Sequence, residues 1–165
     1  MKSKLFLLVV LFLFSLSVNA QTKDEKPFKI GAGALIGITT GDISHFASLA
    51  YGVDVMGEYV IAPSIALTFS LGYLDFVQKS GYSGLKMGLI PILAGAKYHF
   101  SDTLYGSLQA GLSMGTAKGS SSEFTFAPGV GYKISDKFDL LLKYQTASKD
   151  GWDTSFLGVR AGISF

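Results

Sequence analysis

A repeating two-residue period is the feature that most constrains how this 165-residue chain can fold. From Phe28 onward, segments of about ten residues alternate apolar side chains with small or polar ones, which is typical of β-strands. No segment beyond Ala20 has a convincing helical period. The pattern predicts eight strands, at Phe28–Thr39, Leu49–Val60, Ile65–Leu74, Leu85–Phe100, Leu104–Gly115, Phe124–Ile134, Phe138–Thr146 and Phe156–Phe165.

The connections between these predicted strands alternate in length. Four are long and rich in Gly, Ser, Asp and Lys, and three are tight turns. An even number of strands with long and short connections at opposite ends favours an all-β, eight-stranded antiparallel up-and-down transmembrane barrel. Both chain ends then lie on the side of the tight turns. The long connections are predicted at 40–48, 75–84, 116–123 and 147–155, and the short ones at 61–64, 101–103 and 135–137.

The less apolar face of the strands carries Gly, Ala and Ser rather than the Lys, Glu and Thr expected of a face in water. Glycine weakens a strand unless something needs the space, and the interior of an eight-stranded barrel is only just wide enough for side chains. We therefore predict that the glycine-rich face lines the lumen and that the apolar face contacts lipid. A soluble periplasmic barrel is an alternative, because alternation alone also fits a barrel in water.

Aromatic residues on the apolar face cluster toward both ends of the predicted strands. Two levels of aromatic side chains are typical of the interfacial girdles of membrane barrels. The predicted girdle comprises Tyr59, Tyr98, Phe100, Tyr132 and Phe138 toward the short turns, and Tyr51, Tyr73, Phe124 and Tyr144 toward the long loops. Large residues also fall on the lumen face, where a local bulge or slip could reverse several of them: Leu35, Met56, Leu74, Leu93, Tyr105 and Leu141.

Seven charged residues also fall on the glycine-rich face. Buried charges are tolerated only when they are paired, so we predict a salt-bridge network that plugs the lumen, with Arg160 and the lysines facing the acidic residues. A narrow charged channel is the alternative, although aqueous pores belong to barrels of about 16 strands. The predicted lumen charge network is Asp54, Glu58, Lys97, Lys133, Asp139, Lys143 and Arg160.

The N-terminal segment has the features of an export signal. Lys2 and Lys4 precede an apolar run, and Val18-Asn19-Ala20 fits a small-x-small cleavage site. We therefore expect a signal peptide at 1–20, a short periplasmic leader at 21–27 and one barrel domain at 28–165. The run is short for a membrane-spanning helix, which needs roughly 20 apolar residues.

Charge and composition exclude several functions. Loss of Lys2 and Lys4 leaves twelve basic and twelve acidic residues, so no basic surface indicates a nucleic-acid partner. The absence of cysteine excludes disulfides and thiolate metal sites. No His, Asp and Glu cluster has metal-ligand spacing, and no cofactor or metal is predicted. The glycines of Gly31–Gly37 match a dinucleotide fingerprint only superficially, since that motif opens a helix.

The final strand carries a further signal. Val159, Ala161, Ile163 and Phe165 alternate with small or polar residues to the last position, as a strand that closes the barrel requires. With the segment GLIPILAGAKYHFSD at Gly88–Asp102, these residues resemble the small outer-membrane β-barrels of the OmpA/OmpX type. The resemblance covers Phe28 to Phe165. In that family such an ending is the signal read by the barrel-assembly machinery.

The resemblance implies a monomer in the bacterial outer membrane, surrounded by lipid and lipopolysaccharide and inserted by the barrel-assembly machinery. It implies a non-enzymatic role in envelope structure or in surface interaction, with an extracellular ligand bound through the long loops. Passage of small apolar molecules, as in OmpW-type barrels, is the first alternative.

A lipid A-modifying enzyme is the second alternative. His99-Phe100-Ser101 is similar to the His-x-Ser pair of lipid A deacylases, but it lies at a predicted periplasmic turn. His45, in the first long loop, has no serine at that spacing. No catalytic residue is therefore predicted.

Overall fold

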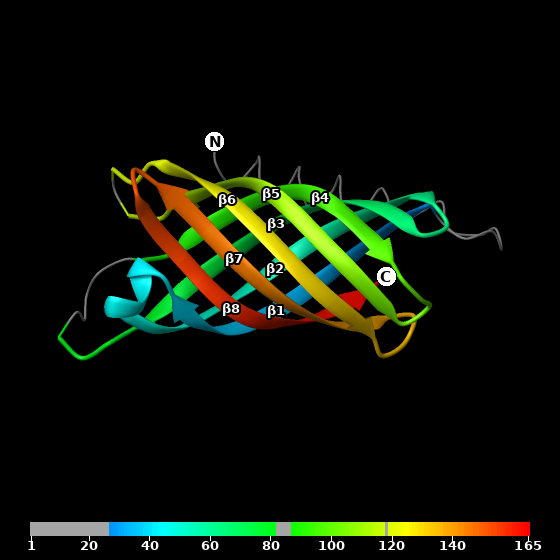
Figure 1. Ribbon diagram of the computed structural model, residues 1–165, viewed down its shortest axis with the longest axis horizontal. Helices are drawn as coiled ribbons and strands as arrows, with labels where there is room; N and C mark the ends of the chain where they lie inside the picture. The colour runs from blue at the N-terminus through cyan, green and yellow to red at the C-terminus, as the bar shows by residue number, and fades with distance from the viewer. Residues whose placement is uncertain (1–26, 82–86, 118) are drawn as a thin grey trace, which may run out of the picture.

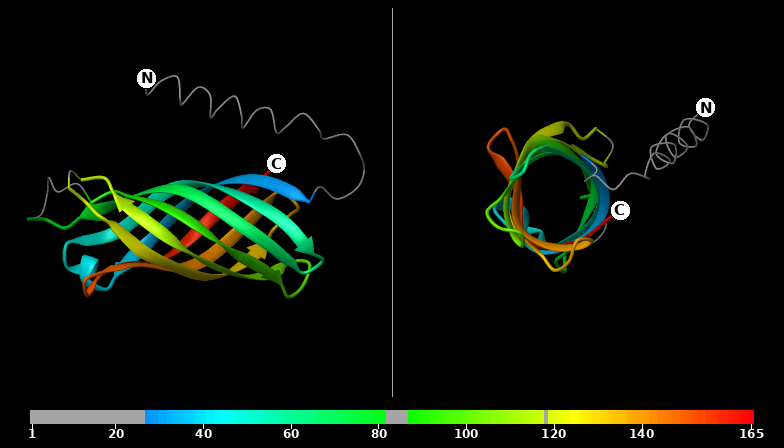
Figure 2. Two further views of the ribbon diagram at one scale, coloured as in Figure 1. Left: turned by 90° about the horizontal axis from the view of Figure 1, so that it is seen from above. Right: turned by 90° about the vertical axis from the view of Figure 1, so that its right-hand side faces the viewer.

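The computed structural model describes residues 27–81, 87–117 and 119–165. Strands β1 to β8 pair antiparallel in chain order, and β8 pairs with β1, so the sheet is a closed barrel (Figure 1; seen end-on in Figure 2). This confirms the predicted eight-stranded up-and-down barrel. The strands are β1 Phe28–Thr40, β2 Ala47–Ala62, β3 Ile65–Gln78, β4 Leu89–His99, β5 Leu104–Gly115, β6 Ser122–Lys133, β7 Phe138–Lys149 and β8 Trp152–Ser164.

Some predictions fall on residues beyond the described ranges. These are the signal peptide, the leader apart from Pro27, and the predicted start of the fourth strand at Leu85. The described part of the chain holds no helix of the length and apolarity needed to cross a bilayer.

The last strand closes the barrel along most of its length. The register at this seam runs from Gly31 opposite Ser164 to Thr40 opposite Ser155. The backbone N–H of Phe165 adds a 2.8 Å hydrogen bond to the carbonyl of Ile30. Pro27, where the described chain begins, and Phe165 therefore lie at the end of the short turns, which we call the short-turn end; the opposite end is the loop end.

The predicted long connection at 147–155 is wrong. Strand β7 continues to Lys149 and β8 begins at Trp152, so only Asp150 and Gly151 connect them. Both have positive φ, 52° and 82°, which suits an Asp-Gly hairpin turn. The strands extend past the alternating apolar pattern because both faces can be polar beyond the lipid band. Strand β3 runs to Gln78 rather than ending at Leu74, because the alternation continues past Asp75 with Phe76 buried and Val77 exposed.

The first connection contains the single turn of 3₁₀ helix that the described residues hold, η2 (Asp42–His45). It lies against β8, β1 and β2 at the loop end. Its Ile43 is buried in a cluster of lumen residues, so this connection packs its apolar side chain onto the mouth of the barrel.

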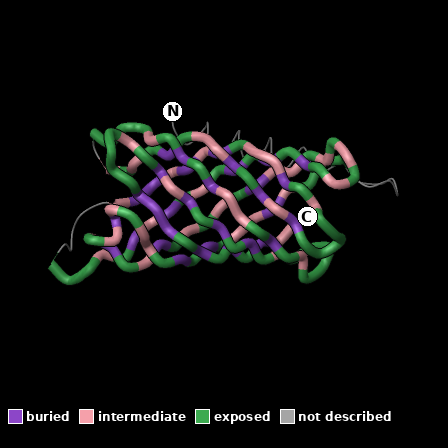
Figure 3. The backbone as a smooth tube through the Cα atoms, in the orientation of Figure 1, coloured by how far each residue is buried: buried purple, intermediate pink, exposed green. Residues whose placement is uncertain are grey.

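Burial alternates along each strand, as Figure 3 shows. Leu141 is 2% exposed, whereas its neighbour Leu142 is 51% exposed. Leu35, Met56, Leu74, Leu93 and Tyr105 are buried like Leu141, so no bulge or slip turned these large residues outward. In the described pairings of β2 with β3, register shifts occur only near the ends of β2.

Prolines interrupt two of the backbone ladders. Pairing of β3 with β4 lapses between Leu71–Ile92 and Leu74–Leu89, beside Pro91. Pairing of β6 with β7 lapses beside Pro128. Proline has no N–H to donate, so the wall is held by fewer hydrogen bonds at these places.

Candidate functional site

The centre of the lumen is organised by Arg160, which β8 points inward. Its guanidinium is almost fully buried and binds the Asp54 carboxylate of β2 through three contacts of 2.7, 2.8 and 2.9 Å. Strand β1 lies between them, and its Gly33 makes the contact possible. A Cβ at Gly33 would lie 2.4 Å from Arg160 Cζ, which is too close for any side chain. The glycine of β1 thus provides the space that the guanidinium occupies.

Asp139 of β7 extends this cluster across the barrel. Its Oδ1 lies 3.9 Å from Arg160 Nη1, and its Oδ2 accepts a hydrogen bond from the hydroxyl of Tyr105 on β5. Tyr105 is 1% exposed, and a Cβ at Gly131 would lie 2.0 Å from its Cζ. A second glycine therefore makes room for a second large side chain.

A second ion pair joins the first through the same tyrosine. Lys97 of β4 donates to Glu58 of β2 at 2.7 Å, and its Nζ lies 4.8 Å from the centre of the Tyr105 ring. A cation over an aromatic face is attracted by the ring. The connected order is Asp54, Arg160, Asp139, Tyr105, Lys97 and Glu58, from five strands.

The structure does not bring all seven predicted charges into ion pairs. Among the described residues, Lys133 and Lys143 form none. Lys143 is nevertheless 8% exposed and lies in the electrostatic field of Asp54 and Arg160. Lys133 lies further toward the short-turn end, where it lines a cavity.

Neutral polar side chains fill another part of the lumen. Gln109 Nε2 donates to Thr68 and Ser70, at 3.2 Å each. Ser113 and Thr125 hydroxyls lie 2.6 Å apart. Buried polar groups satisfied in this way hold the strands in register without a charge.

An apolar cluster occupies the lumen toward the loop end. It joins Leu35, Leu74 and Leu89 with Phe76, Phe156 and Ile43. Sequence reasoning missed Phe76 and Ile43 because both were assigned to long loops. Phe76 could have been found, since it continues the two-residue period of Leu74 on the lumen face. Together the ionic, polar and apolar side chains occupy the lumen from its middle toward the loop end, where a cavity of about 250 Å³ remains beside Ile43, Leu89 and Thr154.

The outer wall is apolar, and the predicted girdle and terminal residues lie there. All nine predicted girdle residues, such as Tyr59 at the short-turn end and Tyr73 toward the loops, are exposed. Val159 and Phe165 are 42% and 77% exposed, and Ala161 is also exposed. Ile163 is partly covered and lines an outer groove. Two statements stay predictions: that the girdle contacts the lipid interface, and that the barrel-assembly machinery recognises the last strand.

The two histidines lie at opposite ends of the barrel. The His99 ring packs 5.7 Å from the Tyr105 ring at the short-turn end, whereas His45 is exposed on η2. The backbone N–H of His99 donates to the Ser64 carbonyl at 2.8 Å, but among the described residues neither imidazole ring forms a hydrogen bond with a serine side chain. Among the residues that the structure describes, no three His, Asp or Glu side chains are placed so that they could hold a metal ion.

An outward apolar wall around a lumen that holds the charged and polar side chains defines a transmembrane β-barrel. The model of the outer membrane protein beta-barrel domain matches residues 6–165, so the chain belongs to this family. It is therefore a protein of the bacterial outer membrane, as its sequence predicted.

Several solved structures share the fold. The attachment invasion locus protein Ail of Yersinia pestis is 14% identical, with a TM-score of 0.57 over 84% of this chain and 97% of that chain. The N-terminal β-barrel domain of Pseudomonas aeruginosa OprF is also 14% identical, with a TM-score of 0.57 over 83% and 97%. A structure from the de novo design of transmembrane β-barrels is 17% identical, with a TM-score of 0.56 over 86% and 99%. These identities show the fold alone. No curated protein matches the sequence.

Proposed function

We propose that this barrel has a non-enzymatic role in surface interaction or envelope structure, carried by its loop end. The observation that carries the proposal is the lumen, where the network from Asp54 to Glu58 and the apolar cluster leave the barrel a packed scaffold. On a rigid scaffold, binding resides in the loops. Small outer-membrane barrels place short turns in the periplasm and longer loops outside, so the loop end faces the exterior.

A defined surface at the loop end supports this proposal. The backbone N–H of Asp153 donates to the Asp42 carboxylate at 2.9 Å, which ties η2 to the β7–β8 turn. The Phe46 and Trp152 rings lie 5.7 Å apart beside this tie, and Lys79 Nζ donates to the Ser44 carbonyl at 2.6 Å. We call Asp42, Phe46, Lys79, Trp152 and Asp153 the loop-end platform. A half-exposed tryptophan beside charged groups is the composition of binding hot spots.

A relative of the same fold supports an extracellular ligand. Ail has been solved in complex with the heparin analogue sucrose octasulfate. We therefore propose that the loop-end platform takes an extracellular polar ligand such as an anionic glycan, which Lys79 and Trp152 would contact.

Binding of intact protein to immobilised heparin tests the platform. Trp152→Ser combined with Lys79→Gln should reduce binding about tenfold, since both a stacking surface and a cation are lost. Tyr98→Ser combined with Lys137→Gln makes equivalent changes at the short-turn end and should leave binding unchanged. Equal binding by wild type and the platform variant would reject this role.

Two further experiments, planar-bilayer recording and lipid analysis, test separately whether the barrel conducts ions and whether it modifies lipid. The packed lumen predicts no steady unit conductance, whereas an ion-selective unit current would show a channel. Lipid A from a strain lacking the protein should be unchanged, and an altered acyl pattern would show an enzyme.

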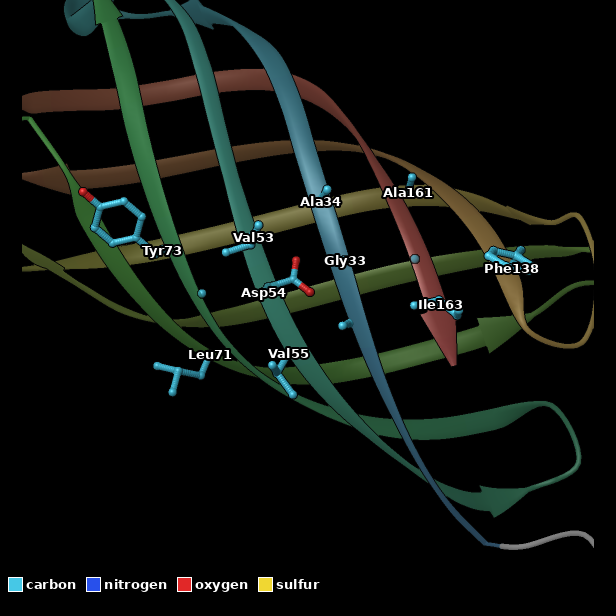
Figure 4. A pocket seen from close by; sticks show the side chains of 13 residues that line it. Gly33, Ala34, Val53, Asp54, Val55, Leu71, Tyr73, Phe138, Ala161 and Ile163 are labelled. Carbon is cyan, nitrogen blue, oxygen red and sulfur yellow. The ribbon is translucent and has the colours of Figure 1, made fainter. Parts of the chain in front are cut away.

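Passage of small apolar molecules through the wall is a second candidate, supported by two features. An outer groove of about 610 Å³ crosses β8, β1, β2 and β3, with small residues at its floor and Tyr73 and Phe138 at its edges (Figure 4). The ladder gap at Pro91 lies on the next strand. Uptake of an apolar dye into protein-containing vesicles should then fall when Ala34→Trp fills the groove. Uptake no faster than in empty vesicles would exclude this function.

A further inference from the structure

The short-turn end of the barrel contains a polar vestibule, at the right-hand end of Figure 1. Two adjoining cavities of about 320 and 350 Å³ share their lining there. This vestibule lies at the opposite end from the loop-end platform, so its role is independent of the function proposed above. The charged residues common to both cavities are Lys29, Glu58, Asp102, Lys133 and Asp136.

Two lysines line this vestibule without an ion-pair partner among the described residues. Lys29 comes from β1 and Lys133 from β6, which are not neighbours in the barrel. They are close enough to repel one another electrostatically. Lys97 lies beside them, but Glu58 neutralises it at 2.7 Å. Two like charges that converge on one cavity favour an anion between them.

His99 adds a polar atom that lacks a partner. Its Nε2 is buried and forms no hydrogen bond, and the ring interacts electrostatically with Lys133, Glu58, Lys97 and Lys29. A buried ring nitrogen without a partner is costly; the ring lines the second cavity, although Nε2 itself does not open onto it. Three basic side chains from three strands thus surround the same space.

Acidic residues and lysines are equal in number around the vestibule, but two of the acidic side chains are engaged by other groups. Asp139 is engaged by Arg160 and Tyr105, and Glu58 is engaged by Lys97. Asp102 and Asp136 lie on exposed turns at the rim, where solvent and salt screen them in part, although Asp102 still attracts Lys133. Lys29 is also exposed, and Lys137 adds a cation to the same rim.

We propose that the vestibule binds a multiply charged oxyanion, phosphate or carboxylate, of a soluble ligand that enters from the short-turn side. Lys29 and Lys133 bind the anion from opposite sides, and the His99 ring lies in the wall beside them. In the orientation proposed above, this ligand is periplasmic.

Nuclear magnetic resonance titration of the mature protein in zwitterionic nanodiscs tests this site. Inorganic phosphate and citrate are the two probes, and chloride at equal ionic strength is the control. Saturable shifts at Lys29, His99 and Lys133 are expected with at least one probe. Tighter binding of phosphate would assign a phosphorylated ligand, and tighter binding of citrate a carboxylate ligand. Shifts that do not saturate, or that chloride reproduces, would overturn the proposal.

Variants distinguish the site from general charge screening. Lys29→Gln and Lys133→Gln should each weaken binding about tenfold, because each removes one charged hydrogen bond. Lys149→Gln, at the loop end, should leave the affinity unchanged. Equal affinity in all three variants would overturn the proposal. Binding that appears only in Asp24→Asn with Glu25→Gln would also overturn it, since the chain's own N-terminal segment would then be the occupant.

Discussion

Arg160 of β8 and Asp54 of β2 meet across β1, with 2.7 Å between Arg160 Nη2 and Asp54 Oδ1. The residues are 106 positions apart in sequence. Strand β1 lies between β8 and β2, and its Gly33 lies beneath the ion pair. The ion pair thus requires Arg160 on the strand that closes the barrel, the carboxylate of Asp54 and the absence of a side chain at Gly33. Several consequences can be measured, and the single tryptophan of the chain, Trp152, offers a fluorescence signal for unfolding.

Gly33→Ala should lower the free energy of unfolding by about 1–3 kcal/mol, the usual cost of overpacking. The added Cβ would lie 2.4 Å from the guanidinium, so Arg160 must move away from Asp54. Urea unfolding in lipid vesicles measures this loss. Gly57→Ala is the control on the outer wall, where the Cβ would lie 3.3 Å from the Phe28 ring and 3.9 Å from the Phe69 carbonyl oxygen. Equal effects of the two changes would contradict the role of Gly33.

Arg160→Ala should destabilise the barrel by about 3–5 kcal/mol, because it leaves the buried carboxylates of Asp54 and Asp139 unpaired. Lys143→Met also removes a buried cation, but one that forms no ion pair with a described residue. Its effect should therefore stay within about 1 kcal/mol. The same unfolding assay compares them, and a Lys143 variant as damaging as the Arg160 variant would refute the assigned network.

Tyr105→Phe should cost about 1–2 kcal/mol, since the buried Asp139 carboxylate loses a hydrogen-bond donor. Tyr98→Phe removes a hydroxyl from an outward tyrosine that is 51% exposed and should be nearly neutral. If the two losses are the same, the Tyr105–Asp139 contact does not contribute to stability.

Gly151→Ala should destabilise the β7–β8 hairpin by about 1 kcal/mol, because φ is 82° at this position. Asp150→Asn should be tolerated, since asparagine also adopts positive φ readily. Unfolding midpoints of the two variants test the turn. A neutral Gly151→Ala would indicate a longer and more adaptable connection.

The sequence predicted the barrel because its period-two pattern is local and repeats in every strand. Strand ends were less predictable. Phe76 and Trp152 lie where the lipid-facing pattern ends, so β3 and β8 were drawn too short. Asp150-Gly151 is a hairpin-turn signal, but it lies within a polar stretch that is equally typical of a long loop.

The sequence predicts on which face of its strand each charged residue lies, but it does not predict the residue's ion-pair partner. Alternation places Lys97, Lys133 and Lys143 in the lumen, yet only the barrel's stagger decides that Lys97 reaches Glu58. Tyr105 was classed as a break in the pattern, although it links the two ion pairs. A pattern along one strand contains no information about which side chain crosses the lumen.

Methyl relaxation at Leu141 and Leu142 tests the inside-out arrangement most directly. These neighbours have the same chemistry but are 2% and 51% exposed. In nanodiscs that contain a paramagnetic spin label on the lipid acyl chain, the Leu142 methyl signals should broaden strongly and the Leu141 signals should persist. Equal broadening, or broadening of Leu141 alone, would contradict a barrel with an apolar exterior and a packed lumen.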